Sequence, residues 1–245
     1  EMFRSLLRIF FLALLVLSIA AGVGGSIIAA ASPSTVEVLT IDGIIVPVVA
    51  DYIDRGISQA ERNGATVCII ELNTPGGLLD TTERIVQSIM GADVPVVVYV
   101  SPKGAWAASA GTFITLAGHI AAMAPGTTIG AAHPVASGEM TEAEEKKIVE
   151  YTAGWMRSIA EERGRNVEEA ELTVRESKTF TYDEALNHNL IDLRAENLAA
   201  LISQINGWTV MVNGEEVVID TTDHVTSRNE MTAIENFLQV ISDPN

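Results

Sequence analysis

Cysteine and basic residues are scarce in this sequence, and the two shortages exclude whole classes of protein. Cys68 is the single cysteine among 245 residues, which excludes an internal disulfide framework, and the four scattered histidines have no zinc-ligand spacing. Only 15 Lys and Arg stand against 32 Asp and Glu, a net charge of −17, whereas phosphate binding needs the opposite balance. We therefore expect neither a metal centre nor a nucleic-acid partner.

Charge is also absent from one long stretch near the start of the chain. Residues 9–31 carry no charged side chain, and Arg4 and Arg8 precede them as the positive end of an export signal. The stretch is long enough to span a bilayer, and Ala29 to Ala31 offer a small-residue cleavage site. We expect residues 1–32 to be either a cleaved signal peptide or a retained transmembrane anchor. The rest of the chain is then expected to be membrane-associated on the extracytoplasmic side.

From residue 33 onward the sequence has the pattern of an α/β domain. Hydrophobic residues make up 48% of the chain, which is enough for a core. Apolar runs at 36–41, 66–72 and 94–100 predict strands, and helical spacing over 48–60 and 78–90 predicts the helices between them. Short apolar strands alternating with amphipathic helices are typical of a mostly parallel sheet covered on both faces. Functional residues are expected at the carboxyl ends of such strands.

The second half of the chain predicts a long helix and a terminal extension. Thr141 and Glu144 have capping-box spacing and open the helix. Its buried face is expected to contain Ile148, Tyr151, Thr152, Trp155, Met156 and Ile159. The dipeptide Asn213-Gly214 predicts a β-hairpin. We expect a domain over residues 33–206, a hairpin extension over 207–228 and an amphipathic segment over 229–245.

Two glycine-containing turns follow two of the predicted strands. NTPGG, with Gly76 and Gly77, comes after the strand at 66–72, and GAWAASAGT, a loop entering a small-residue helix at Ser109, comes after 94–100. Because parallel strands end at the same edge of a sheet, these turns should be neighbours. Backbone N–H groups directed at a ligand beside a serine hydroxyl make an oxyanion hole. Gly-Gly turns and serine N-caps are also common structural features, so this spacing alone does not separate a catalytic site from ordinary turns.

The order of five motifs resembles that of the ClpP-class serine proteases. NTPGG, AASAGT, IGAAHP, ERGRN and FTYDEALNHNLID follow one another within residues 36–206, and this order is most similar to the membrane-bound NfeD branch. The resemblance implies a ClpP- and crotonase-like spiral β/β/α fold and a hydrolase that needs no metal or other cofactor. It implies Ser109 as the nucleophile, with an oxyanion hole formed by the Gly76-Gly77 turn and the amide of Ala110.

The general base has two candidates under this resemblance. His133 stands where ClpP has its catalytic histidine, but Ser177 stands where ClpP has the aspartate that orients the ring. The NfeD branch instead uses a Ser-Lys dyad, and the corresponding residue here is Lys147.

Lys147 differs from the neighbouring Lys146 in its surroundings. Lys146 has a glutamate four residues away on either side, whereas Lys147 has an alanine and a tyrosine. A lysine serves as a base only where removal from water lowers the pKa of an amine. Since Lys147 adjoins the predicted buried face of its helix, we expect it to be desolvated and to be the base. We expect His133 to be a loop or substrate-pocket residue.

Two further features bear on the substrate and on the end of the chain. Trp106 stands where many family members have a small residue, so it is expected to line or narrow the substrate pocket. In the NfeD branch the segment resembling residues 237–245 leads into transmembrane helices and a small β-barrel domain. We therefore expect residues 229–245 to lead toward a membrane region that this sequence does not contain.

Together these predictions describe an extracytoplasmic, membrane-associated serine endopeptidase that cleaves apolar peptide segments. The resemblance implies a stomatin-like membrane protein as partner, with its hydrophobic C-terminal region as substrate, and a homodimer or higher homo-oligomer. Two alternatives stay open: a non-proteolytic scaffold that organises stomatin-like proteins, and a signal-peptide-degrading Ser-Lys protease of the signal peptide peptidase A type. A crotonase-like acyl-CoA enzyme is disfavoured because the acidic balance opposes the CoA phosphates.

Overall fold

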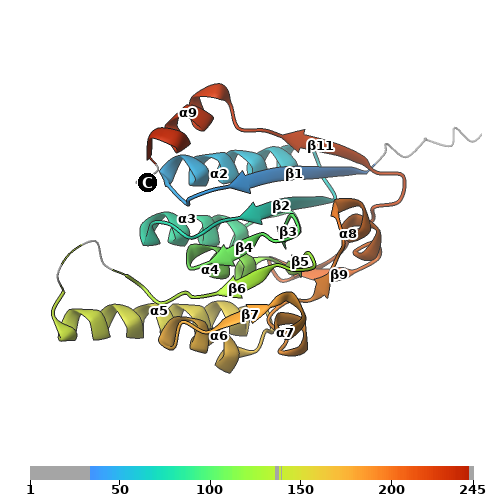
Figure 1. Ribbon diagram of the computed structural model, residues 1–245. Helices are drawn as coiled ribbons and strands as arrows, with labels where there is room; N and C mark the ends of the chain where they lie inside the picture. Colours follow the sequence, from blue (N-terminus) through green and yellow to red (C-terminus); the bar gives the residue numbers. More distant parts are fainter. Residues whose placement is uncertain (1–33, 136–137, 139, 243–245) are drawn as a thin grey trace, which may run out of the picture. The chain divides into compact units, whose positions relative to one another are not determined.

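The central element of the protein is a parallel β-sheet of six strands. The computed structural model describes residues 34–135, 138 and 140–242. Within them the strand order is β11-β1-β2-β3-β5-β8, and every neighbouring pair runs parallel (Figure 1). The predicted mostly parallel α/β sheet is therefore confirmed. The strands are β1 (Thr35–Asp42), β2 (Val67–Asn73), β3 (Val96–Val100), β5 (Ile120–Met123), β8 (Leu193–Arg194) and β11 (Val225–Asn229).

The two faces of this sheet belong to two separate cores. Leu39 and Ile41 of β1 lie in the larger core with the helices that connect the strands. Val36 and Val38 lie in the smaller core on the other face, because successive side chains of a strand alternate between faces. Helices of the larger core include α2 (Pro47–Arg62), α3 (Leu79–Met90) and α4 (Ala110–Ala117), and the smaller core is closed by α8 (Leu198–Gln204) and the hairpin β9 (Thr209–Val212) and β10 (Glu215–Val218).

A second sheet contains the turn that holds Ser109. It has three strands in the order β4 (Trp106–Ala108), β6 (Thr128–Gly130) and β7 (Thr179–Thr181). The sequence predicts a loop at 104–108, but β4 forms there because it is paired on both sides. It runs parallel to β6 on one side, and on the other Thr74 N–H donates to the Trp106 carbonyl at 2.8 Å.

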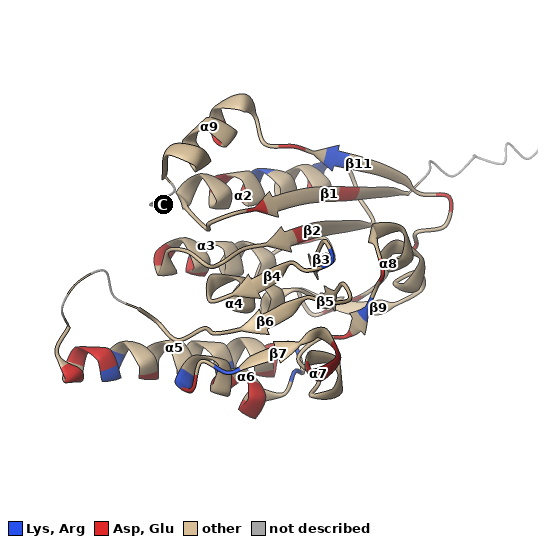
Figure 2. Ribbon diagram, in the orientation of Figure 1, with Lys and Arg blue, Asp and Glu red and all other residues tan. Residues whose placement is uncertain are grey.

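Helix α5 (Glu142–Glu162) begins as predicted but packs only in its second part. Thr141 and Glu144 form the capping box. Residues 141–147 are all exposed, since the first turns of α5 extend past the neighbouring elements, where the ribbon of Figure 2 is coloured for charged residues of both signs. Tyr151, expected on the buried face, is 54% exposed and donates to Glu83 of α3 at 2.8 Å. The fully buried part of this face therefore begins at Thr152, four residues after Ile148, where the predicted face began.

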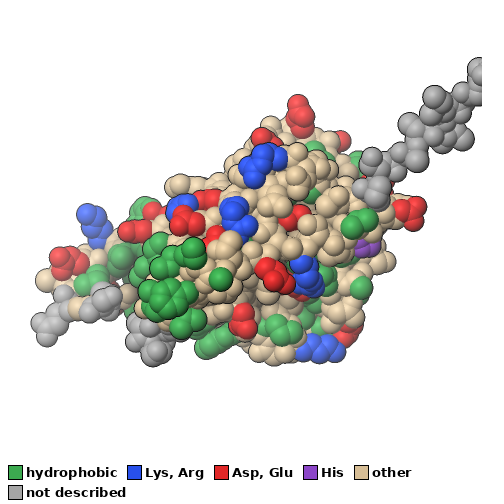
Figure 3. Space-filling view, turned by 90° about the horizontal axis from the view of Figure 1, so that it is seen from above, with side chains coloured by type: hydrophobic (Ala, Val, Ile, Leu, Met, Phe, Trp, Pro, Cys, Tyr) green, Lys and Arg blue, Asp and Glu red, His purple; other side chains and the backbone are tan. Residues whose placement is uncertain are grey.

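The last part of the chain adds two strands to the main sheet, one before the hairpin and one after it. α6 (Val167–Arg175) and α7 (Tyr182–Asn187) precede β8, and the predicted hairpin is present as β9 and β10. β11 then pairs with β1, and α9 (Ala233–Ser242) lies on α2, with an ion pair of 2.8 Å between Arg55 and Glu235. Apolar residues of α9 such as Phe237 face outward, at the end of the domain where Figure 3 shows apolar side chains gathered.

The expected signal or anchor segment, residues 1–32, lies outside the described residues. So do residues 243–245 at the end of the predicted amphipathic segment. Among the residues that the structure does describe, no helix combines the length and the apolar character needed to cross a membrane.

Candidate active site

Ser109 occupies a strained turn between strand β4 and helix α4. Its φ of 52° and ψ of −112° are unusual for a residue with a side chain, and such strain persists only where neighbours hold the backbone in place. The Ser109 N–H donates to the Gly130 carbonyl at 2.9 Å, and the Thr112 hydroxyl donates to the same carbonyl at 2.8 Å. A sharp strand-to-helix turn of this kind exposes a serine hydroxyl at the start of the helix.

The Gly76-Gly77 turn lies directly against Ser109. Gly76 has a φ of 127°, and a Cβ added there would be 2.8 Å from the Cβ of Ser109. A Cβ on Gly77 would be 2.1 Å from the carbonyl oxygen of Ile45. Neither position has room for a side chain, so the two glycines let the turn approach the serine as the sequence predicts.

Two backbone amides at this point have no acceptor within the described part of the chain. Gly76 N–H, which we expected to contribute to the oxyanion hole, donates instead to the Thr74 hydroxyl at 3.1 Å. The amides of Gly77 and of Ala110, at the start of α4, have no such partner. They are placed to bind an oxyanion next to Ser109. Thr74 was not singled out in the sequence, although a threonine two residues before a turn amide is a recognised turn signal.

A largely apolar cavity of about 510 Å³ opens beside Ser109, Gly77 and Ala110. Besides Ser109, two lining residues carry hydroxyls, and both are engaged elsewhere: Thr82 donates to the Leu78 carbonyl at 2.8 Å and Thr152 donates to the Ile148 carbonyl at 2.8 Å. The cavity therefore suits an apolar group. Its apolar lining includes Ile44, Leu78, Leu79, Phe113, Val135 and Ile148.

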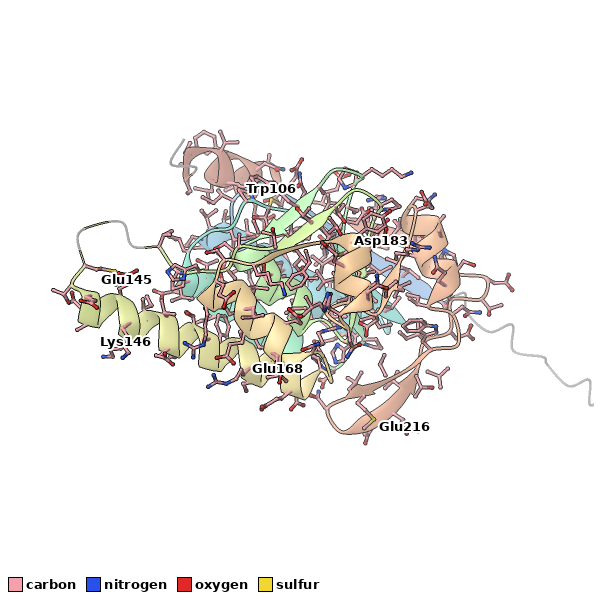
Figure 4. All side chains as sticks on the ribbon, turned by 60° about the horizontal axis from the view of Figure 1, so that its bottom comes forward. Trp106, Glu145, Lys146, Glu168, Asp183 and Glu216 are labelled. Atoms are coloured by element: carbon pink, nitrogen blue, oxygen red, sulfur yellow. The ribbon has the colours of Figure 1, made fainter. Side chains whose placement is uncertain are left out.

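Lys147 lies beside this cavity and is not among its lining residues. It is exposed, contrary to our expectation, because the first turns of α5 extend past the packed part of the domain. It lines a separate hollow of about 430 Å³ with Met140 and Tyr151, and Ile148 borders both this hollow and the Ser109 cavity. No hydrogen bond joins Lys147 to Ser109 among the described residues. Figure 4 shows the neighbouring residues Glu145 and Lys146 on different sides of the helix.

His133 is oriented by a partner that residue types do not reveal. Its Nδ1 lies 2.8 Å from the Val174 carbonyl, so this nitrogen carries the proton, and Nε2 lies 4.0 Å from a carboxylate oxygen of Glu145. Ser177, in the position of the ClpP aspartate, is exposed and supplies no carboxylate. Although Ala132 and Pro134 line the cavity, His133 does not. Its two ring nitrogens therefore face Val174 of α6 and Glu145 of α5.

Trp106 also lies outside the cavity that it was expected to line. It is 49% exposed on β4, and its amide donates to the side chain of Asn73 at 3.2 Å (Figure 4). Within the described ranges, no group of three or more His, Cys, Asp or Glu residues is arranged to hold a metal ion.

Comparison with known proteins places this arrangement in a family. The family model of the NfeD1b N-terminal domain matches residues 35–219. The chain belongs to the NfeD family. Two relatives are the membrane-bound protease PH1510 of Pyrococcus horikoshii, 38% identical over 216 residues, and the membrane protein NfeD1b of Bacillus subtilis, 32% identical over 142 residues. The matches cover 86% and 58% of this NfeD chain, but only 49% and 30% of the relatives, so the chain spans at most about half of their length.

Solved structures resemble this NfeD domain over almost their whole length. The 1510-N membrane-bound stomatin-specific protease, as a lysine-to-alanine mutant in complex with a substrate peptide, is 35% identical with a TM-score of 0.81, covering 86% of this chain and 99% of that one. The 1510-N protease of Pyrococcus horikoshii is 34% identical with a TM-score of 0.76, covering 86% and 100%. ClpP1 of Listeria monocytogenes, 24% identical with a TM-score of 0.54 over 67% of this chain and 94% of its own, shares the fold. The predicted ClpP-like fold is confirmed.

Proposed function

We propose that this chain is a membrane-associated serine endopeptidase with Ser109 as its nucleophile. The observation that carries the proposal is the strained Ser109 turn. At an apolar cavity it meets the amides of Gly77 and Ala110, which have no acceptor among the described residues. Ser109 Oγ would attack the scissile carbonyl, and the two amides would stabilise the negative charge that develops on its oxygen. Water would then hydrolyse the acyl-enzyme.

Lys147 is the proposed base that takes the proton from Ser109 and passes it to the leaving amine. Its hollow borders the Ser109 cavity at Ile148, so a peptide lying across both would cover the lysine and remove it from water. Loss of water favours the neutral amine, which is the form that accepts a proton. The 1510-N relative has been solved both as a serine-to-alanine and as a lysine-to-alanine mutant, which supports a role for this residue pair.

The proposed substrate is an apolar segment of a stomatin-like membrane protein. The apolar lining of the cavity supports this class of substrate, and 1510-N is described as specific for a stomatin homologue. We place the domain on the extracytoplasmic side, because Arg4 and Arg8 precede the uncharged run. We also propose a homodimer or higher homo-oligomer as the working form.

Labelling with a fluorophosphonate probe tests the proposal, because such probes react only with an activated serine. We expect the full chain, purified in detergent, to be labelled, and Ser109→Ala to lose labelling at an unchanged melting temperature. Lys147→Ala should lower the labelling rate by about 100-fold or more, as expected for loss of a general base. Lys146→Ala, on the same exposed turn, is the matched control and should be labelled at the wild-type rate.

Three results would contradict these assignments. A wild-type chain that is folded but unlabelled, at every pH from 6 to 10, would support the scaffold alternative. Labelling that persists in Ser109→Ala would exclude Ser109 as nucleophile. Loss of labelling in His133→Ala, with Lys147→Ala unaffected, would assign the base to His133.

A further inference from the structure

Helix α4, which begins directly after Ser109, is buried along its whole length. All eight of its residues are buried. The last carbonyls of an α-helix have no partner within the helix, and here water does not reach them. The residue after the helix, Gly118, has a φ of −57° and a ψ of 144°, so it does not form the left-handed glycine cap that often satisfies such carbonyls. Donors from elsewhere in the fold are required.

Two arginines of the ERGRN motif supply these donors. Arg165 donates from Nε to the Leu116 carbonyl at 3.1 Å and from Nη2 to the Gly118 carbonyl at 3.0 Å. Arg163 donates from Nε to the Ala117 carbonyl between them at 2.8 Å. Three consecutive carbonyls at the end of α4 are thus held by two guanidinium groups, which also place positive charge at the negative end of the helix.

Arg165 is itself fixed on its other side. Only 5% of the residue is exposed, and its Nη1 donates to the Asp192 carboxylate at 2.9 Å and to the Leu190 carbonyl at 3.3 Å. The same oxygen of Asp192 accepts from Ala121 N–H at 2.7 Å, which ties it to β5. Such a set of acceptors needs the planar fork of a guanidinium, and a lysine cannot reproduce it.

His119, which lies near Arg163, does not carry a second positive charge at this end of α4. Its Nδ1 accepts a hydrogen bond from Val96 N–H at 3.1 Å. Burial, with Arg163 adding to the effect, lowers the pKa of His119 to about 4, so the ring is neutral at physiological pH. The two arginines are then the charged donors at this end of α4.

We propose that Arg165, assisted by Arg163, is a positioning residue that sets where α4 places Ser109 and the Ala110 amide. The inference rests on the proposed serine protease function. An eight-residue helix spans roughly 12 Å and behaves as a short rod, so a shift at Leu116 to Gly118 moves the serine at the other end. A misplacement of about 1 Å at a reacting group costs about 100-fold in rate. The arginines of the ERGRN motif thus affect catalysis through the position of α4 and not through contact with the substrate.

The test compares Arg165→Lys with Arg157→Lys in the full chain. Arg157 lies on α5 and pairs with Glu171 at 2.7 Å in a more exposed position, so Arg157→Lys makes the same chemical change at an ion pair that has no hydrogen bond to α4. We expect Arg165→Lys to lower the fluorophosphonate labelling rate and the kcat for an apolar fluorogenic peptide by about 10- to 100-fold, with KM changed less than about twofold. Arg157→Lys should retain the wild-type kcat. Both are measured well below the melting temperature of each variant, with folding verified by circular dichroism.

A purely structural role for Arg165 would lower the melting temperature and leave kcat per folded molecule unchanged, and that result would overturn the proposal. If Arg165→Lys does not fold, Arg163→Lys takes its place, since it removes only the contact to the Ala117 carbonyl. A kcat reduced about two- to fivefold in that variant supports positioning, and a wild-type kcat overturns it. Failure of the proposed function is distinguishable, because the wild-type chain would then not be labelled at all.

Discussion

Gly76 lies where a side chain would collide with the nucleophile. Its added Cβ would be 2.8 Å from that of Ser109, and its φ of 127° disfavours any residue other than glycine. We expect Gly76→Ala to lower the labelling rate at Ser109 by about 100-fold, because the added carbon displaces the hydroxyl from the two free amides.

Gly64→Ala is the matched control for this change. Gly64 has a φ of 63° but no neighbour within 4 Å of an added Cβ, so its replacement costs only backbone strain, about 1–2 kcal/mol. Labelling should be unchanged in this variant. Normal labelling of Gly76→Ala would mean that the glycine turn can move away from the serine without loss.

Glu37 is a buried carboxyl group without a partner. It is 0% exposed in β1, and neither side-chain oxygen has a hydrogen-bond partner among the described residues. Leaving such a group unsatisfied costs about 1–3 kcal/mol. We expect Glu37→Met to raise the melting temperature by several degrees, as measured by differential scanning calorimetry. Glu71→Met is the control, since Glu71 pairs with Arg228 at 2.9 Å and should show no gain. A lower melting temperature in Glu37→Met would reveal a partner of the carboxyl group.

Residue types were enough to predict one part of the site and not the other. Ser109, Gly77 and Ala110 line one cavity, as the motif order indicated. The partner of His133 is a main-chain carbonyl, which has no signature in the sequence because every residue carries one. Cys68 is buried in β2, and this burial raises the pKa of its thiol, with Glu37 adding to the shift.

Elements could be predicted where side chains follow a period, and were missed where backbone pairing alone forms them. β2 and β3 are nearly continuous apolar runs and lie in the middle of the main sheet. β11 has the sequence VTSRN and lies at the sheet edge, mostly exposed, so no apolar pattern marks it. β4 has three residues, too few for a period. The exposure of Lys147 was not predicted for a similar reason. The helical spacing of apolar residues in α5 does not show at which residue the helix extends past the elements that it packs against.

The capping box of α5 stabilises helical turns whose residues are all exposed. Thr141→Ala removes a helix cap worth about 1 kcal/mol. Because residues 141–147 are exposed, we expect faster hydrogen exchange over the first turns of α5 and a melting temperature within about 2 °C of the wild type. Thr181→Ala removes the same kind of box from α7, which has the buried residue Ala185, and should lower the melting temperature more. Equal losses in the two variants would show that the start of α5 belongs to the cooperative core.

At the scale of the whole molecule, the alternation of strands and helices predicted a parallel sheet but not its order. Strand order depends on pairings between segments far apart in the chain, such as Thr35 with Val225. No local pattern encodes such a pairing. The segment after residue 206, predicted as an extension, in fact supplies the sixth strand beside β1.

The pairing of β11 with β1 has a mechanical consequence. The two strands are parallel, with Thr35 opposite Val225 and Leu39 opposite Asn229, so residue 34 enters at one end of the pair and the chain leaves toward α9 at the other. A tension applied between these two points acts along the strands, as a shear. All hydrogen bonds of the pair then resist together, whereas peeling would break them one at a time. A domain pulled at these two points would therefore keep its sheet closed.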